Sequence, residues 1–129
     1  MHELEMIDKV LRTIEDEAKK QGFTRINDAH LQIGKMNGLE KSYFLDAISS
    51  KKEGPLKSSK LNLEEMPVEL ECTHCKHKYI DKRFDDHHFA HTTSHAPYLY
   101  MPPSCPLCHK DGAKIVSGTQ MKLVSIDGE

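Results

Sequence analysis

The sequence predicts an α+β fold in which two helices pack on a small mixed sheet, and a zinc-ribbon-like lobe with four cysteines interrupts this domain. Three observations predict this class. The N-terminal region has helical periodicity, three separate stretches alternate as strands do, and two Cys-x-x-Cys pairs lie between the second and third of these stretches. We therefore expect residues 1–69 and 113–129 to form an α/β domain, and residues 70–112 to form a zinc-binding domain.

The two predicted helices occupy residues 4–21 and 39–49. In the first, apolar residues recur at three- and four-residue steps with charged residues between them: Leu4, Ile7, Val10, Leu11, Ile14 and Ala18. Gly22 follows as a typical residue for ending a helix. After the second predicted helix, residues 51–59 are polar and contain glycine and proline, which is typical of a linker.

The predicted strands lie near residues 25–34, 60–72 and 113–126. The first alternates apolar and polar residues, and the second does so up to the first cysteine. Pro67 predicts an edge position or a bulge there, because proline cannot donate a hydrogen bond to a neighbouring strand. Residues 113–126 should form two short strands around a turn at Ser117 and Gly118. We expect the sheet to combine strands near 25–34, 61–70 and 119–127.

The four cysteines predict a zinc site. They form two pairs, Cys72-Thr-His-Cys75 and Cys105-Pro-Leu-Cys108. Two intervening residues let both sulfurs of a pair reach one ion from a tight turn, and two such turns complete a tetrahedral site. A redox pair or four unrelated thiols are the alternatives. Because four thiolates leave no open position for water, the zinc is expected to be structural and not catalytic.

Nine histidines form the second signal. Four of them lie in residues 85–95, within the 29-residue segment 76–104 between the cysteine pairs that we predict to be a loop: His87, His88, His91 and His95. Such a segment is either a solvated surface or the source of one or two ligands for a second metal.

The first three residues, Met1, His2 and Glu3, form a potential chelate. The terminal amine, the amide and imidazole nitrogens of His2 and the amide of Glu3 can surround one ion in a plane. This arrangement suits Ni²⁺ or Cu²⁺ and does not suit tetrahedral zinc. The ligands must be deprotonated, so binding should weaken on acidification. An ordinary exposed N-terminus is the alternative.

Composition argues against two classes of partner. The net charge of −2 and the pI near 6.5 are unlike those of a basic nucleic-acid-binding domain. No apolar run approaches the length of a membrane span, and residues 1–25 show no signal-peptide pattern. The sequence therefore predicts a cytoplasmic protein that binds neither nucleic acid nor membrane.

The whole pattern resembles the HypA family of nickel metallochaperones. The likeness spans nearly the entire chain and includes the opening "MHE", the segments "LQIGKMNGLEKS" and "GPLKSSKLNLEEMPVELEC", the two cysteine pairs and the final "VSIDGE". It implies that Met1, His2 and Glu3 bind Ni²⁺, which is delivered to NiFe-hydrogenase, and that Cys72, Cys75, Cys105 and Cys108 bind structural Zn²⁺. The long segment between the pairs resembles the archaeal form, in which a histidine approaches the nickel. His88 is the first candidate for this ligand and His95 the second.

The resemblance also implies partners and a role without catalysis. A HypB-type GTPase and the hydrogenase large subunit are the expected partners, and the chain itself has no phosphate-binding G-x-x-x-x-G-K-[ST] motif. The sequence departs from the family in "CPLCHKDG", where many members have "CPxCGS", so His109 adds a competing metal donor. Two other classes stay open: a zinc-ribbon interaction module, and a metallohydrolase that uses the loop histidines with Asp85 and Asp86.

Overall fold

The computed structural model describes residues 3–129, and Met1 and His2 lie outside the described residues. The chain forms two compact units. Unit 1 comprises the chain up to Gln32, Glu40–Glu64 and Met121–Glu129, and unit 2 comprises Ile33–Leu39 and Glu65–Gln120. Within residues 3–129, no helix combines the length and the apolar character that crossing a membrane requires.

Helix α1 (Glu3–Gln21) confirms the first predicted helix. It buries one face, made of Met6, Ile7, Val10, Leu11, Ile14 and Ala18. Leu4 continues the same stripe but is 58% exposed, because periodicity gives the direction of a side chain and not the extent of the surface that covers it. The helix ends as predicted at Gly22, which has a φ of 73°. The next amide, that of Phe23, donates to the carbonyl of Ala18.

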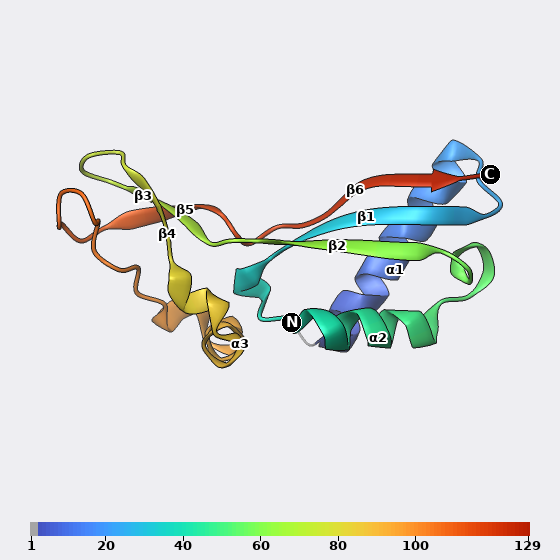
Figure 1. The fold of residues 1–129 in the computed structure, drawn as a ribbon, viewed down its shortest axis with the longest axis horizontal. Helices are drawn as coiled ribbons and strands as arrows, with labels where there is room; N and C mark the ends of the chain where they lie inside the picture. The colour runs from blue at the N-terminus through green and yellow to red at the C-terminus, as the bar shows by residue number, and fades with distance from the viewer. Residues whose placement is uncertain (1–2) are drawn as a thin grey trace. The chain divides into compact units, whose positions relative to one another are not determined.

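The sheet of unit 1 has the order β2-β1-β6, with β1 (Ile26–Gly34) between β2 (Lys60–Met66) and β6 (Met121–Gly128) (Figure 1). Along β1, Ala29 and Leu31 are buried while His30 between them is exposed. This alternation shows that one face of the sheet is covered and the other is open. α1 packs against β6 and against α2 (Lys41–Lys51), so unit 1 is the predicted layer of two helices on a sheet.

Helix α2 begins two residues later than predicted because Glu40 caps it. The Glu40 carboxylate accepts hydrogen bonds from the amides of Ser42 and Tyr43, at 3.2 and 2.7 Å. These amides have no partner within the helix, so a side-chain acceptor stabilises its first turn. Phe44 and Ile48, one turn apart, are fully buried and fix the helix on unit 1.

The single strand predicted over residues 60–72 is wrong in one respect: it is two strands in different sheets. β2 ends at Met66, and β3 (Glu69–Cys72) belongs to the sheet of unit 2. Pro67 lies between them and interrupts the pairing, as its missing N–H requires. The predicted turn at Ser117 and Gly118 separates β5 (Ala113–Ser117) from β6, and these two strands are likewise in different sheets.

Unit 2 is built on a second sheet with the order β4-β3-β5, in which β3 runs antiparallel to both β4 (Lys78–Ile80) and β5. Its buried core consists of Val68, Leu70, Phe84 and Ala90. Met36, from the short 3₁₀ segment η1 (Lys35–Asn37), packs against this core. The connection that follows β1 in the chain is therefore a structural part of unit 2.

The segment predicted as a loop, residues 76–104, is largely ordered into regular elements. After β4 it contains the 3₁₀ turns η3 (Lys82–Asp85) and η4 (Pro97–Leu99), with helix α3 (His87–His95) between them. Asp86 begins α3 by accepting a hydrogen bond from the amide of His88 at 3.1 Å. Ala90 and Thr93 bury the inner side of the helix. The sequence prediction missed α3 because its apolar face is short.

Candidate metal sites

The two cysteine pairs form two turns with the same backbone hydrogen bonds. In the first, the Cys72 amide donates to the His77 carbonyl at 2.9 Å, and the Lys76 amide donates to the Cys72 carbonyl at 3.0 Å. In the second, Cys105 bonds to Lys110 at 3.1 Å, and His109 bonds to Cys105 at 2.9 Å. The fourth residue after each leading cysteine has a positive φ: 68° at Lys76 and 63° at His109. His109 is thus the residue with positive φ in the second cysteine turn.

Backbone amides in each turn point at the leading sulfur. The amides of His74 and Cys75 lie 3.4 and 3.5 Å from the Sγ of Cys72. Those of Leu107 and Cys108 lie at the same two distances from the Sγ of Cys105. Such donors stabilise negative charge on sulfur, so both turns favour thiolates, which are the form that binds metal.

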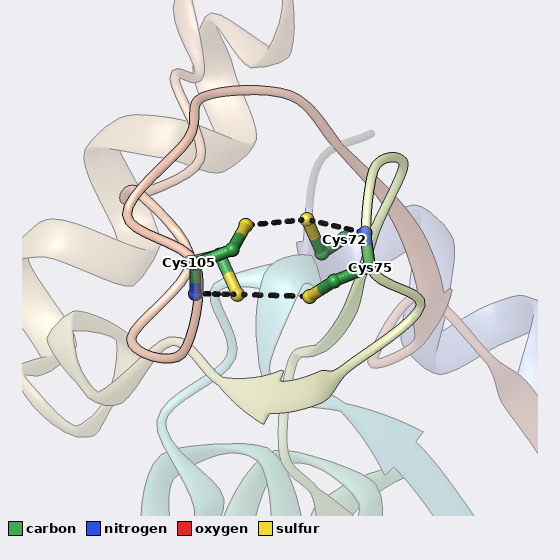
Figure 2. Close-up of side chains that lie close together, drawn as sticks. Cys72, Cys75 and Cys105 are labelled. Atoms are coloured by element: carbon green, nitrogen blue, oxygen red, sulfur yellow. Dashed lines mark hydrogen bonds between the residues drawn. The ribbon is translucent and has the colours of Figure 1, made fainter.

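The four sulfurs converge on one point from the two turns (Figure 2). The Sγ atoms of Cys72 and Cys108 are 3.6 Å apart, as are those of Cys75 and Cys105, and all four lie within 4.8 Å of one another. A tetrahedral zinc ion with Zn–S bonds of 2.3 Å requires sulfurs about 3.8 Å apart. The cluster therefore fits zinc, and the four free thiols are drawn from both pairs, as a single four-sulfur site requires.

The acid–base behaviour of the cluster also favours a bound cation. Backbone hydrogen bonds from Cys75 and His74 lower the pKa of the Cys72 thiol to about 6. At Cys75 a backbone hydrogen bond to His77 acts in the same direction, but burial and the neighbouring sulfurs of Cys105, Cys108 and Cys72 raise the pKa to about 12. The first thiol ionises readily and a later one resists, because it is partly desolvated and its proton is shared with the neighbouring sulfurs. A divalent cation at the centre would stabilise all four sulfurs as thiolates.

Four exposed histidines lie on one side of α3, opposite its packed side. His87, His91 and His95 follow one another at four-residue steps. Their ring centroids are 5.8 Å apart for the first pair and 4.6 Å apart for the second. His88 lies on the adjacent line of the same helix surface. The spacing His-x-x-x-His-x-x-x-His was visible in the sequence, but it has structural meaning only once the segment is known to be a helix.

An ionic network around the buried carboxylate of Asp81 holds the segment that carries α3. Asp81, 2% exposed, accepts hydrogen bonds from the Nε and Nη2 of Arg83 at 3.0 and 2.8 Å, and from the hydroxyl of Tyr100 at 2.7 Å. The guanidinium of Arg83 also donates to the Met101 carbonyl and lies 4.8 Å from the ring centroid of Phe89. The two ends of the segment are thereby joined on either side of α3. Sequence reasoning missed this network, since nothing local marks Asp81 and Tyr100 as partners.

The sequence-predicted ligands have different outcomes in the structure. Cys72, Cys75, Cys105 and Cys108 come together as one cluster. His88 and His95 lie on α3 and are exposed. Glu3 is the first residue of α1, whereas Met1 and His2 lie outside the described residues. Of Asp85 and Asp86, the first pairs with Lys35 at 2.6 Å and the second caps α3, so neither is shown joined to a histidine cluster.

Comparison with known protein families decides what the chain is. The profile described as "Hydrogenase/urease nickel incorporation, metallochaperone, hypA" matches residues 1–128. The chain belongs to the HypA family. This membership confirms the family resemblance of the sequence, and with it the role of a nickel metallochaperone in hydrogenase maturation.

Individual relatives align over almost their whole lengths. The hydrogenase maturation factor HypA of Moorella thermoacetica is 28% identical over 130 residues and covers 100% of both chains. The hydrogenase maturation factor HypA of Methanothermobacter thermautotrophicus is 29% identical, over 98% of this chain and 95% of its own. The hydrogenase/urease maturation factor HypA of Helicobacter pylori is 26% identical, over 98% and 97%.

A solved HypA structure supports the fold. The solution structure of the nickel metallochaperone HypA from Helicobacter pylori superposes with a TM-score of 0.63 at 25% identity, covering 99% of this chain and 97% of that one. The predicted α+β class with a four-cysteine lobe is confirmed by this likeness and by the sulfur cluster. Within the HypA family, the cysteine site of this chain is thus one suited to zinc.

Proposed function

We propose that this chain binds Ni²⁺ through Met1, His2 and Glu3 and delivers it during NiFe-hydrogenase maturation, while Zn²⁺ in the cysteine cluster is structural. The proposal is supported by the presence, in one chain, of two donor sets with opposite preferences. The four sulfurs form a closed tetrahedral cluster. The N-terminal residues supply nitrogen donors for the planar coordination that Ni²⁺ favours. One chain can then hold zinc permanently and nickel transiently.

The start of α1 supports a nickel site at this end. Helix α1 begins at Glu3, so the amide nitrogens of its first turn have no acceptor within the helix. A metal that takes the Glu3 amide nitrogen therefore breaks no helical hydrogen bond. The positive end of the helix dipole opposes a bare cation there, but deprotonated amides bring negative charge, and the exposed Glu5 adds more.

A histidine of α3 can serve as an additional nickel ligand in this proposal. His88 and His95 are both exposed, so either is accessible. They are seven residues apart on one helix, which separates them by about 10 Å along its axis. They therefore do not form the pair four residues apart that binds one ion on a helix, and we treat them as alternatives. Replacement of one nitrogen donor by such a histidine would link nickel release to movement of α3.

The partners belong to the same proposal. We expect a HypB-type GTPase to supply the nucleotide hydrolysis that this chain's sequence does not encode, and the large subunit of a NiFe-hydrogenase to receive the nickel. We expect the chain to act in the cytoplasm and to have no catalytic activity of its own. The family description also includes urease, so a urease is a second acceptor to test in a host that makes one.

Nickel titration of untagged, zinc-loaded protein tests the proposal. His2→Ala removes the imidazole and one chelate ring, so high-affinity nickel binding should disappear while zinc content and circular dichroism stay unchanged. One extra residue before Met1 should have a similar effect, because it displaces the amine. Equal affinity in the extended protein would show that the amine is not a ligand. Loss of high-affinity binding and a changed visible spectrum in His88→Ala, or in His95→Ala but not in His91→Ala, would identify the additional ligand.

A further inference from the structure

We propose that helix α3 carries a second, exchangeable site for a divalent cation that prefers imidazole ligands, formed by His91 and His95 with His87 beside them. All of its donors come from one helix. It therefore differs from the nickel site proposed above, in which residues 1–3 supply most of the ligands. The expected ion is a divalent metal of the first transition row, such as Ni²⁺, Cu²⁺ or Zn²⁺, for which neutral imidazole is a suitable donor.

The spacing of the pair along the helix is that of a helical two-histidine chelate. His91 and His95 are one turn apart, and side chains at this spacing lie next to each other on the helix surface. Their ring centroids are 4.6 Å apart, at an interplanar angle of 73°. Histidines four residues apart on a helix are also the pair that binds zinc in helical metal motifs. His87 extends the line, with its ring centroid 5.8 Å from that of His91.

The opposite side of α3 is fixed, so the pair is held in place before any metal arrives. Ala90 is 4% exposed and belongs to the core of unit 2, against which Phe89 also packs. Gly38 approaches so closely that a Cβ atom there would lie 2.9 Å from the Ala90 carbonyl and 2.6 Å from the Ser94 hydroxyl. A helix fixed on its inner side loses little further freedom when a metal bridges its outer side, and preorganisation of this kind favours binding.

The site is open, which makes it exchangeable. His87, His91 and His95 are all exposed, and among the residues that the structure describes only the four cysteines converge as a cluster of three or more ligand atoms. A cation on α3 would therefore take two imidazoles from the protein and complete its coordination with water. Such an ion binds more weakly than one in a closed site and leaves without unfolding the lobe.

The test is a titration with Ni²⁺ alone in zinc-loaded protein that also carries His2→Ala, so that the N-terminal site makes no contribution. This background should still bind a nickel ion by equilibrium dialysis. Adding His91→Gln or His95→Gln should lower the affinity by a factor on the order of 10², because each change turns a two-point attachment into a single one. His87→Gln should have a smaller effect.

Two matched variants control for general changes. Thr92→Gln alters the exposed surface of α3 without removing an imidazole, and His30→Gln removes an exposed imidazole from β1. Both should bind nickel as the His2→Ala background does. Nickel should also slow hydrogen exchange of the α3 amides in the background, and not in its His91→Gln form.

The site is excluded if the His2→Ala background binds no nickel, or if His91→Gln and His95→Gln bind it as well as the background does. A similar loss of affinity in His30→Gln would also exclude it, since binding would then follow the total number of imidazoles. These results are independent of the N-terminal proposal, which depends on what His2→Ala itself removes from the wild-type titration.

Discussion

The cysteine cluster and the histidine row of α3 lie in the same unit but are assembled in opposite ways. The sulfurs come from two turns separated by residues 76–104, and they meet only when unit 2 is folded. The histidines come from consecutive turns of one helix and need only that helix to be adjacent. A site closed by distant segments is coupled to folding, whereas a local and open site can gain and lose its ion without consequence for the fold.

The largest expected effect is on the cysteine side of this comparison. Cys72→Ala or Cys108→Ala leaves three thiolates, and metal binding at a structural zinc site contributes about 10–16 kcal/mol of folding free energy. Zinc should be lost and unit 2 should unfold, while helix α1 stays folded on unit 1. Zinc analysis and residue-resolved hydrogen exchange measure both outcomes. His91→Gln is the matched change on the histidine side, and it should leave zinc and protection intact.

If the cysteine variants keep one zinc per chain and a protected β3, the cluster is not coupled to folding. The contrast between the two sites would then fail.

The second prediction destabilises the segment that carries α3 and leaves the cysteine cluster intact. Asp81→Asn weakens the network that joins the two ends of the segment around α3, without touching a sulfur. We expect unit 2 to lose about 2 kcal/mol, because hydrogen bonds to a buried charged group are replaced by weaker ones. Hydrogen exchange in α3 should accelerate while zinc content is unchanged. Tyr100→Phe, which removes one of these hydrogen bonds, should cost about 1 kcal/mol.

This second effect should also depend on pH in a defined direction. Burial alone would raise the pKa of Asp81, but hydrogen bonds from Arg83 and Tyr100 outweigh it and hold the pKa below its ordinary value of 3.8. A lowered pKa means that the carboxylate stabilises the folded state fully above its ordinary pKa, and that this contribution is lost as the pH falls through the lowered value. Urea unfolding of the wild type and of Asp81→Asn should therefore show a difference in unfolding free energy that is constant near neutral pH and shrinks below about pH 4. A difference that grows on acidification would contradict the assignment.

The smallest effect concerns Lys76 and His109, the residues with positive φ in the two cysteine turns. His109 has a φ of 63°, a conformation that costs a residue with a Cβ about 1 kcal/mol and costs glycine almost nothing. His109→Gly should therefore stabilise unit 2 by about 0.5 kcal/mol, after part of the gain is offset by the flexibility of glycine in the unfolded chain. Lys76→Gly should act in the same way.

Lys110→Gly, beside His109 but without a positive φ, is the control and should be destabilising. Unchanged metal affinity in His109→Gly would show that the histidine after the last cysteine is a turn residue and not a competing donor.

The two sites also differ in how far the sequence could predict them. The Cys-x-x-Cys turns are closed by their own backbone hydrogen bonds, so spacing alone was enough to predict the cluster. Helix α3 is stabilised by Asp86 at one end and by packing on Val68 and Leu70, which are distant in the sequence. The sequence identifies its histidines as candidate ligands, but it does not predict that they lie in a row on one side of a helix.

The same limit applies to the strands. Pro67 and the pair Ser117 and Gly118 marked the right interruptions, because backbone chemistry determines them locally. That β3 and β5 leave the first sheet and pair with each other depends on long-range contacts, which alternation does not encode. The prediction that the first residues bind nickel still rests on the sequence, because Met1 and His2 lie outside the described residues.

The inclusion of the connection between β1 and α2 in unit 2 has a consequence for exchanging lobes among relatives. A transplanted piece bounded by residues 70 and 112 would lack Met36, which covers part of the core around Ala90, and Lys35, which pairs with Asp85. The excised fragment would expose apolar surface beneath α3, and a chimaera would face a foreign partner there. Residues 33–39 must therefore accompany the lobe in any such exchange, so this short connection and α3 are expected to have changed together as the family diverged.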